Sequence, residues 1–576
     1  IGLAISGAAS GGAYEAGVLD YLVEALDCWY AAKANNEDVP QHDVKLKTVA
    51  GTSAGGMNSA ILSIALNWGY QPHNYYCQEK KSPESCPSPC ADEKPKDSVW
   101  GEAATKYTSP FYTTWVEKIN IDDLLKTDDI DLDKLKLPSL LNSNCLKDIL
   151  KYTLNFKGIE IPPDKKAYRD WAINPLPINL TVTNLRGVPY QLGFNEGTAV
   201  SYYNMKLHKD FMSFLVEGLP TQKEIKGYTK VKYPNNAEDR NWGMLGESAL
   251  ATGAFPVGLA PVKLERPYEE YDYRIRCETC ESGYISPKKI EEGVKECPKD
   301  KYCFVAVDGG VMDNEPFDVA RDVLYKEESS DEKIHKAIFL IEAFPTNDDL
   351  NDNLKPNIIE SVLGMFQAQI DQARFKKKDL ILANQRKKIR NRYLIQPHRG
   401  TDASDSEKIV LASAPLNAFF GFFARAYREH DFQLGRHNCQ KFLRDTFTLP
   451  DNNPLFKESK NENPSMVTQF LASDGERQII PLVGHCQEEE PLPVWPSGCC
   501  AGRSELEKYL KCSFWCSKGD LGEKIYKRLN KIADYLNKNY EGGWVGWFAK
   551  RWFRGDVLNW LYQKIVDAAK KVDDAK

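Results

Sequence analysis

Several features that would assign this chain to a large class of proteins are missing from its sequence. No stretch approaches the roughly 18 apolar residues that a membrane-spanning helix needs, which argues against an integral membrane protein. Lys and Arg number 75 against 81 Asp and Glu, and a net charge of −6 spread along the chain argues against a nucleic-acid partner. The G-x-G-x-x-G spacing of a dinucleotide-binding turn is also missing, which excludes a Rossmann domain.

The composition is that of an ordinary globular protein with a large core. The chain has 576 residues, of which 42% are hydrophobic and 27% are charged, so it exceeds one typical domain. It begins at Ile1, inside an expected strand, without a methionine or a signal-like segment. We therefore expect a processed or trimmed product.

A Gly-x-Ser-x-Gly motif places Ser53 between Gly51 and Gly55. The apolar residues 44–50 precede the motif, and residues 57–66 follow it with a helix-compatible pattern. A strand, a tight turn and a helix in this order form a nucleophile elbow. The two glycines lack the Cβ atoms that would obstruct the turn, and the helix N-terminus would favour negative charge beside the serine hydroxyl.

A second segment of small residues lies near the start of the chain, between a short apolar strand and an expected helix. Small residues let backbone N–H groups approach an anion closely, as an oxyanion hole requires. The same pattern also fits an ordinary glycine-rich turn between a strand and a helix. The candidate oxyanion residues are Gly7, Ala8, Ala9, Ser10, Gly11 and Gly12.

A third segment is an apolar strand over residues 304–307 that ends at Asp308 and is followed by Gly309 and Gly310. An aspartate before glycine is usually a turn cap. A carboxylate at a strand end can also be a base, because active-site groups of open α/β sheets gather there. This segment alone leaves both roles open.

Together and in this order, the three segments resemble the patatin-like phospholipase family. That family has a glycine-rich oxyanion loop, here residues 7–12, then Gly-x-Ser-x-Gly, here 51–55, then Asp-Gly-Gly, here 308–310. Weaker similarities follow in the right order at residues 179–185 and 249–256. The resemblance implies an α/β fold of three layers with a central, mostly parallel sheet, to which this chain adds a helical C-terminal extension.

The resemblance also implies a serine hydrolase with a Ser–Asp dyad that requires no cofactor. Ser53 would be the nucleophile and Asp308 the base. Because an ordinary aspartate, with a pKa of about 3.9, is a weak base for a hydroxyl group, we expect burial in an apolar cleft to raise its pKa. The same cleft would accept acyl chains. Four glycines would support the turns around the dyad: Gly51, Gly55, Gly309 and Gly310.

The oxyanion loop departs from the family pattern, which usually has Gly-Gly-Gly-x-Arg/Lys-Gly. This chain has Ala8 and Ala9 in place of two glycines, and Gly11 in place of the basic residue. The backbone N–H groups remain, so we expect the hole to form unless either alanine must adopt a positive φ. The Ser10 hydroxyl is a further candidate donor. We therefore predict an active, if slow, phospholipase of the A type.

Two alternatives stay open at this point. The first is an esterase or lipase that acts on neutral lipids or small esters, because the cleft walls that would select a headgroup are not identifiable from the sequence. The second is a catalytically impaired patatin-like module used for binding or assembly, in which Ala8, Ala9 and Gly11 mark lost activity.

Histidine is scarce, with eight residues in all. A Ser–Asp–His triad needs a histidine after the acid, and His430 is the attractive candidate. It lies in a charge-rich helical pattern, where a surface or hydrogen-bonded role is favoured. The dyad also explains the Asp308-Gly309-Gly310 segment, which the triad does not.

We predict three parts of the chain: an acyl hydrolase domain at 1–348 with cysteine-containing insertions at about 71–110 and 265–302, a helical extension at 349–475, and a Cys- and Trp-bearing helical tail at 476–576. Residues 428–436 are similar to a C-terminal segment of larger bacterial members of the family. The oligomeric state stays open.

Fifteen cysteines are many for a cytosolic enzyme. The pairwise spacing of a zinc ribbon occurs at Cys277, Cys280, Cys297 and Cys303, although five residues separate the second pair. The total favours disulfides over structural zinc. An oxidising compartment, periplasmic or secreted, is then favoured over the cytoplasm.

Aromatic and basic residues are interleaved in the tail from Trp544 to Tyr562. This pattern suits a bilayer surface, but at helical spacing it favours packing against the core of the protein itself. A phospholipid or other lipid ester as substrate would still bring the protein to an interface, so we expect peripheral membrane association.

Overall fold

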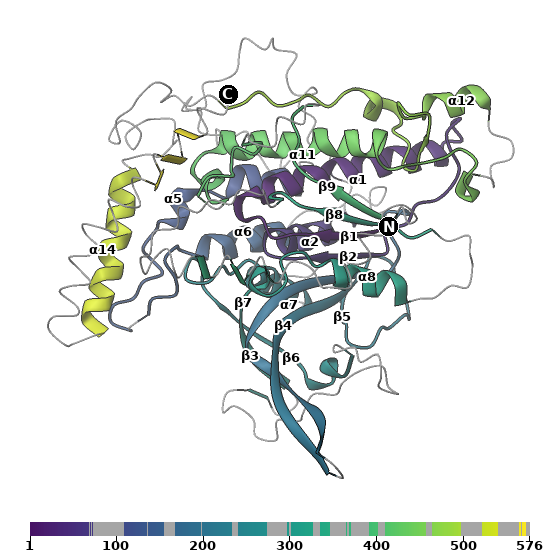
Figure 1. Ribbon diagram of the computed structural model, residues 1–576. Coiled ribbons are helices and arrows are strands. Elements are labelled where there is room, and N and C mark those ends of the chain that lie inside the picture. The colour runs from purple at the N-terminus through teal and green to yellow at the C-terminus, as the bar shows by residue number, and fades with distance from the viewer. Residues whose placement is uncertain are drawn as a thin grey trace.

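A nine-stranded sheet lies at the centre of the described part of the molecule, with helices on both of its faces (Figure 1). The computed structural model describes residues 1–67, 70, 72, 109–134, 136–154, 168–196, 199–232, 240–273, 297–298, 301–326, 335–345, 364–365, 368–369, 372, 391–400, 409–416, 418–456, 463–496, 521–539, 564–565, 567–568 and 570–571. Among these residues, no helix combines the length and the apolar character that crossing a bilayer requires. The predicted α/β class is confirmed.

The central strands of the sheet run parallel, as predicted. β1 (Gly2–Ile5) pairs with β2 (Thr48–Gly51) on one side and with β8 (Ile338–Ile341) on the other. Next to β2 lies β3 (Leu176–Glu196), and next to β8 lies β9 (Arg392–Ile395), both in parallel pairing. The other strands of this sheet are β4 (Ala199–Glu217), β5 (Thr229–Lys232), β6 (Val262–Pro267) and β7 (Lys301–Asp308). Antiparallel pairing joins β3 to both β4 and β7, and β7 to β6.

Both faces of the central strands are buried, which explains their continuous apolar sequences. Leu3 and Ile5 belong to the larger core, on the face covered by α1 (Gly12–Ala34). Ala4 and Ala50 belong to a smaller core on the other face, together with residues of α8 (Phe317–Lys326). Alternation along the strand therefore divides the side chains between two helical layers.

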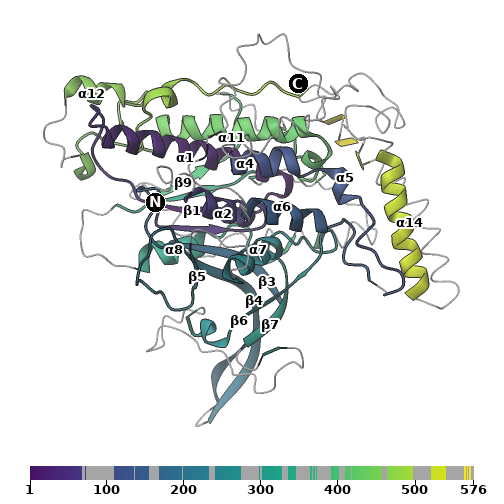
Figure 2. The ribbon, with the colours of Figure 1, turned by 180° about the vertical axis from the view of Figure 1, so that it is seen from behind.

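Two long helices, α1 (Gly12–Ala34) and α11 (Arg425–Asp445), lie side by side over the sheet in both views (Figures 1 and 2). The shorter α2 (Ala54–Ala65) packs against β2 and α1. The other helices are α4 (Pro110–Tyr112), α5 (Ile121–Leu124), α6 (Asn144–Leu154), α7 (Arg240–Thr252), α12 (Pro464–Gln469) and α14 (Leu521–Asn539). A small ribbon joins β10 (Thr448–Leu449) and β11 (Arg477–Gln478).

Glycines bring α1 and α11 into backbone contact. A Cβ atom on Gly17 would lie 1.9 Å from the carbonyl oxygen of Phe432, and one on Gly435 would lie 2.1 Å from that of Tyr14. Next to this contact, the buried Arg436 binds carboxylates of α1. The predicted C-terminal extension therefore shares a core with the N-terminal domain.

The predicted extension at 349–475 contributes α11, a helix, and also β9, a strand that the sequence did not predict. The three domain boundaries stay a prediction. Most of the 71–110 insertion and the aromatic tail from Trp544 to Tyr562 lie outside the described residues. α14, from the predicted tail, is held by ion pairs from Arg528 to Asp129 at 2.9 and 3.0 Å.

Candidate active site

Ser53 lies in the tight turn between β2 and α2, immediately before the helix begins. Its φ of 52° and ψ of −120° are uncommon for a non-glycine residue, and such a conformation costs about 1–3 kcal/mol. The Ser53 N–H donates to Thr252 Oγ1 at 2.8 Å, at the end of α7. The surrounding packing therefore holds the serine in a strained elbow.

The turn fits only glycine at its two flanking positions. A Cβ atom on Gly51 would lie 2.3 Å from the carbonyl oxygen of Gly55, and one on Gly55 would lie 2.4 Å from that of Ile5. Real Cβ atoms essentially never make such short contacts. The sequence motif thus corresponds to a direct steric requirement.

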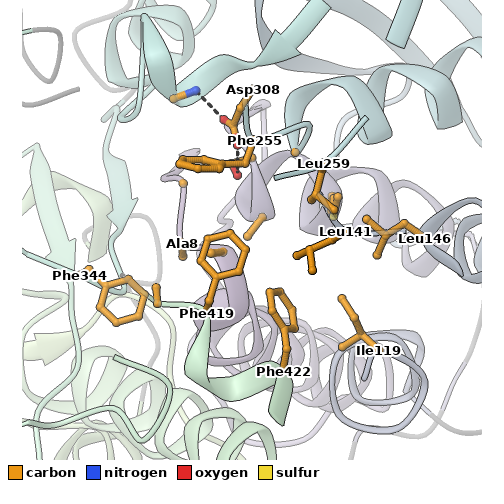
Figure 3. A pocket seen from close by; sticks show the side chains of 18 of the residues that line it. Ala8, Ile119, Leu141, Leu146, Phe255, Leu259, Asp308, Phe344, Phe419 and Phe422 are labelled. Carbon is orange, nitrogen blue, oxygen red and sulfur yellow. Dashed lines mark hydrogen bonds between the residues drawn. The ribbon is translucent and has the colours of Figure 1, made fainter. Parts of the chain in front are cut away.

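Asp308 ends β7, 255 positions from Ser53, and the fold brings the two side chains together (Figure 3). The Ser53 hydroxyl donates to Asp308 Oδ2 at 2.7 Å, and the Gly310 N–H donates to Oδ1 at 2.7 Å. The backbone of Asp308 is fixed as well, because its N–H donates to the carbonyl of Ala254 at 2.9 Å. Gly309 passes close to β3, where a Cβ atom would lie 2.2 Å from Thr181 Oγ1.

Burial raises the pKa of Asp308 to about 6, while the hydrogen bonds from Ser53 and Gly310 act in the opposite direction. At pH 7 the carboxylate is then mostly ionised and more basic than an exposed aspartate. These two properties together allow it to accept a proton from the serine hydroxyl.

The candidate oxyanion loop at residues 7–12 lies beside Ser53, but most of its N–H groups already have partners. Gly7 donates to the carbonyl of Asn314, Ser10 to Ala418, Gly11 to Ala8, and Gly12 to Ala9 and Ser10. In the described part of the chain, the N–H groups of Ala8 and Ala9 make no hydrogen bond, and neither does that of Ala54 at the start of α2. All three residues line the cavity next to Ser53.

Ala9 adopts a φ of 42°, which is the positive φ under which we expected from the sequence that the oxyanion hole would not form. A left-handed conformation costs an L-residue other than glycine about 1–2 kcal/mol. Ala8 has an ordinary φ of −140°. The family pattern usually has glycine at both positions, and only Ala9 carries the steric cost.

We expect Ala9→Gly to raise the free energy of unfolding by about 1 kcal/mol, because glycine adopts this φ without strain. Ala8→Gly is the matched control. It should lower stability by about 0.5–1 kcal/mol, since it adds backbone freedom without relieving strain. Chemical denaturation of both variants measures the difference, and a loss of stability in both would contradict the argument.

Ser10 and Gly11 connect the loop to the C-terminal half of the chain. The Ser10 hydroxyl donates to the carbonyl of Ala418 and accepts the N–H of Gly421, so it is engaged away from the position of an oxyanion donor. A Cβ atom on Gly11 would lie 2.4 Å from the ring of Phe344. That ring therefore fills the space beside the position where the family usually has a basic side chain.

A cavity of about 350 Å³ opens beside Ser53 and Asp308 (Figure 3). One part of its apolar lining comes from the N-terminal domain and includes Ile119, Leu141, Leu146, Phe255 and Leu259. The other part comes from residues that follow β8: Phe344, near the end of the predicted domain at 1–348, and Ala414, Ala418, Phe419 and Phe422 from the C-terminal extension. Figure 3 shows side chains of both groups around one space.

Sequence reasoning missed the C-terminal wall of the cavity. The only signal was the Phe-Phe-Gly-Phe-Phe segment at residues 419–423, which also fits a hydrophobic core segment. Thr252 was missed as well, since a threonine near the end of a helix does not reveal that it accepts the N–H of Ser53.

His430, the candidate for a triad, does not line the cavity. Its Nδ1 lies 2.8 Å from Asp431 Oδ1 within α11. Asp431 also accepts the N–H groups of Ala412 and Ser413, so the pair holds the segment at 412–413 against α11.

The cysteines of the predicted zinc ribbon are described only in part. Cys297 and Cys303 are joined in a disulfide, and sulfur atoms in a disulfide are not thiolate ligands. Cys277 and Cys280 lie outside the described residues, so their role stays a prediction.

Comparison with known proteins gives two findings. Residues 3–321 match the family described as patatin-like phospholipase. The chain is also similar to the uncharacterised protein y4iI of Sinorhizobium fredii, with 32% identity over 532 residues, which cover 86% of this chain and 72% of that protein.

Proposed function

The chain belongs to the patatin-like phospholipase family, and from that membership and the contents of its cavity we propose that it hydrolyses acyl esters of lipids, phospholipids first among them. The observation that carries the proposal is the 2.7 Å contact between the Ser53 hydroxyl and Asp308 at the wall of an apolar cavity. This contact supplies a nucleophile and a base where an acyl chain would lie.

In the proposed reaction, Ser53 Oγ attacks the ester carbonyl carbon while its proton passes to Asp308 Oδ2. The tetrahedral intermediate collapses, the C–O bond to the alcohol breaks, and Asp308 returns the proton to the leaving alcohol. Water then attacks the acyl-enzyme with Asp308 as base, which releases the fatty acid and restores Ser53. Apart from the water that is consumed, each step needs only groups that line the cavity.

The N–H groups of Ala8, Ala9 and Ala54 are the proposed oxyanion donors. They are available in the described structure and line the cavity beside Ser53. Two helices also begin there, α1 at Gly12 and α2 at Ala54, and their N-terminal dipoles favour a developing negative charge. This set replaces the six-residue loop of the sequence analysis.

The apolar lining supports a long acyl chain rather than a small polar ester as the substrate. We propose that the protein takes its lipid substrate from the surface of a membrane or lipid aggregate, where long-chain esters occur. A panel of phospholipids, diacylglycerols and short-chain esters tests this choice. Faster turnover of neutral lipids would favour the lipase alternative instead.

Labelling with a fluorophosphonate probe tests the proposed nucleophile, because the probe reacts with an activated serine hydroxyl. Wild type should be labelled, and Ser53→Ala should not. Ser63→Ala is the matched control, since Ser63 lies in α2, the helix that follows Ser53, and its hydroxyl donates to the carbonyl of Ala60. An unlabelled wild type that also fails to release fatty acid would reject the hydrolase and favour the binding module.

The pH dependence of kcat/KM should follow the ionisation of Asp308. A general base acts only when deprotonated, and burial raises the pKa of Asp308 to about 6. We expect kcat/KM to be flat above pH 7 and to fall about tenfold per pH unit below 6, reaching a loss of about 100-fold at pH 4. A midpoint near 4, measured while circular dichroism shows an intact fold, would contradict this assignment.

A further inference from the structure

Three metal-ligating side chains meet on the side of α1 that faces the C-terminal segment. Cys28 lies near the end of α1, whereas His485 and Cys486 lie in a turn at residues 484–487. One possible ligand atom from each residue lies within 4.8 Å of the others. No other such group occurs among the residues that the structure describes. The proposed hydrolase chemistry uses none of the three.

The separations suit a tetrahedral ion. Cys28 Sγ lies 4.0 Å from His485 Nδ1 and 3.7 Å from Nε2. Zn–S and Zn–N bonds of about 2.3 and 2.0 Å at a tetrahedral angle place sulfur and nitrogen about 3.5 Å apart. A shift of about half an ångström would therefore bring Cys28 Sγ and His485 Nδ1 to the separation of two zinc ligands.

A carboxylate already orients the histidine. His485 Nε2 lies 2.9 Å from Glu24 Oε1, while Glu24 Oε2 accepts from the buried Arg436 at 2.6 Å. Arg436 is held in turn by Asp20 and Glu490. With Nε2–H donating to Glu24, Nδ1 is left as the ligand nitrogen. Such carboxylate–histidine pairs commonly support metal-bound histidines.

The surroundings also favour a cation. His485 and Cys486 line a small polar pocket together with Glu24 and the acidic residues 488–490. Negative side chains attract a divalent ion, and a carboxylate or a water molecule in this pocket would supply the fourth ligand. The half-exposed His485 leaves a route for entry. Two sulfurs and an imidazole select zinc over magnesium or calcium.

We propose that Cys28, His485 and Cys486 bind one Zn²⁺ ion that fastens the C-terminal segment to α1. The ion would join residues 457 positions apart in the chain. It would lie along the same helix whose N-terminus faces Ser53, and its role would be structural. The site is separate from the cavity and does not depend on the proposed hydrolase activity.

Metal titration of the full-length, reduced protein tests this site. After removal of metal with a chelator, wild type should bind one more equivalent of Zn²⁺ than Cys28→Ser or His485→Gln. Co²⁺ should give wild type the visible band of tetrahedral thiolate coordination, and both variants should lose that contribution. Cys145→Ser is the control, since Cys145 is a partly buried free cysteine outside the cluster. It should retain the full stoichiometry.

The measurement is a difference between variants because cysteines outside the described residues can also bind metal. Zn²⁺ should raise the melting temperature of wild type and of the Cys145→Ser control more than that of His485→Gln, whose exposed position makes misfolding a small concern. Equal zinc content and equal Co²⁺ spectra in wild type and both cluster variants would overturn the proposal. So would a Cys28–Cys486 disulfide that persists in protein prepared with zinc.

Discussion

Asp308→Asn is expected to lower lipid ester hydrolysis by about a thousandfold or more and, at pH 8, to raise the melting temperature. The loss of activity follows because an amide cannot accept the Ser53 proton, and removing a catalytic base has effects of about 10³–10⁴-fold or larger in other serine hydrolases. The gain in stability follows from the burial of an ionised carboxylate, whose pKa is raised to about 6.

The stabilising effect of Asp308→Asn has a defined pH dependence. Because the folded state binds the Asp308 proton more tightly than the unfolded state, ionised Asp308 destabilises the fold above pH 6. This penalty shrinks as the pH falls from 6 towards the unfolded value near 4. A shift of about two pKa units corresponds to an upper limit of about 3 kcal/mol. The difference in melting temperature between variant and wild type should therefore be larger at pH 8 than at pH 5.

Asp318→Asn is the matched control for this prediction. Asp318 is a buried aspartate of α8 whose carboxylate pairs with Lys209 at 3.2 Å. Its replacement should lower stability at pH 8 and leave hydrolysis near the wild-type level. If Asp308→Asn retained activity, the dyad would be wrong. If it lost activity and stability together at pH 8, the unfavourable burial of the Asp308 charge would be wrong.

The sequence predicted what depends on local steric rules. The tight turn at Ser53 needs the glycines on either side of it, and active-site groups of open α/β sheets gather at strand ends, where Asp308 lies. Both features can therefore be recognised without coordinates. The concern about a positive φ in the oxyanion loop was also local, and Ala9 has that φ.

The unpredicted features depend on long-range contacts. The Ser10 hydroxyl binds a carbonyl 408 positions away, and the Phe344 ring lies against Gly11. No periodicity or motif links such residues, so the sequence alone could not show that the C-terminal half completes the cavity. The strand β9 escaped prediction for a similar reason, because a four-residue strand is specified by its neighbour β8 more than by its own pattern.

Gly435→Ala is expected to lower the free energy of unfolding by about 3 kcal/mol and to reduce hydrolysis. The new Cβ atom would lie 2.1 Å from the carbonyl oxygen of Tyr14, so α1 and α11 would have to separate. Overpacking of this kind costs about 1–3 kcal/mol, and more where buried ion pairs are disturbed. The adjacent Arg436, whose guanidinium is buried against Asp20 and Glu24, is such a case.

A second glycine separates the steric effect from the effect of adding a methyl group to a helix. Gly243 lies within α7 with no atom near its hypothetical Cβ, so Gly243→Ala should leave stability unchanged or raise it by up to about 1 kcal/mol. Thermal unfolding and fatty acid release are measured for both variants. The segment just before α11 forms part of the active site: the carbonyl of Ala418 accepts the Ser10 hydroxyl, and the rings of Phe419 and Phe422 line the cavity. Loosening α11 should therefore slow hydrolysis. A stable but inactive Gly435→Ala protein, or a stable and fully active one, would show that α11 docking does not couple stability to the cavity.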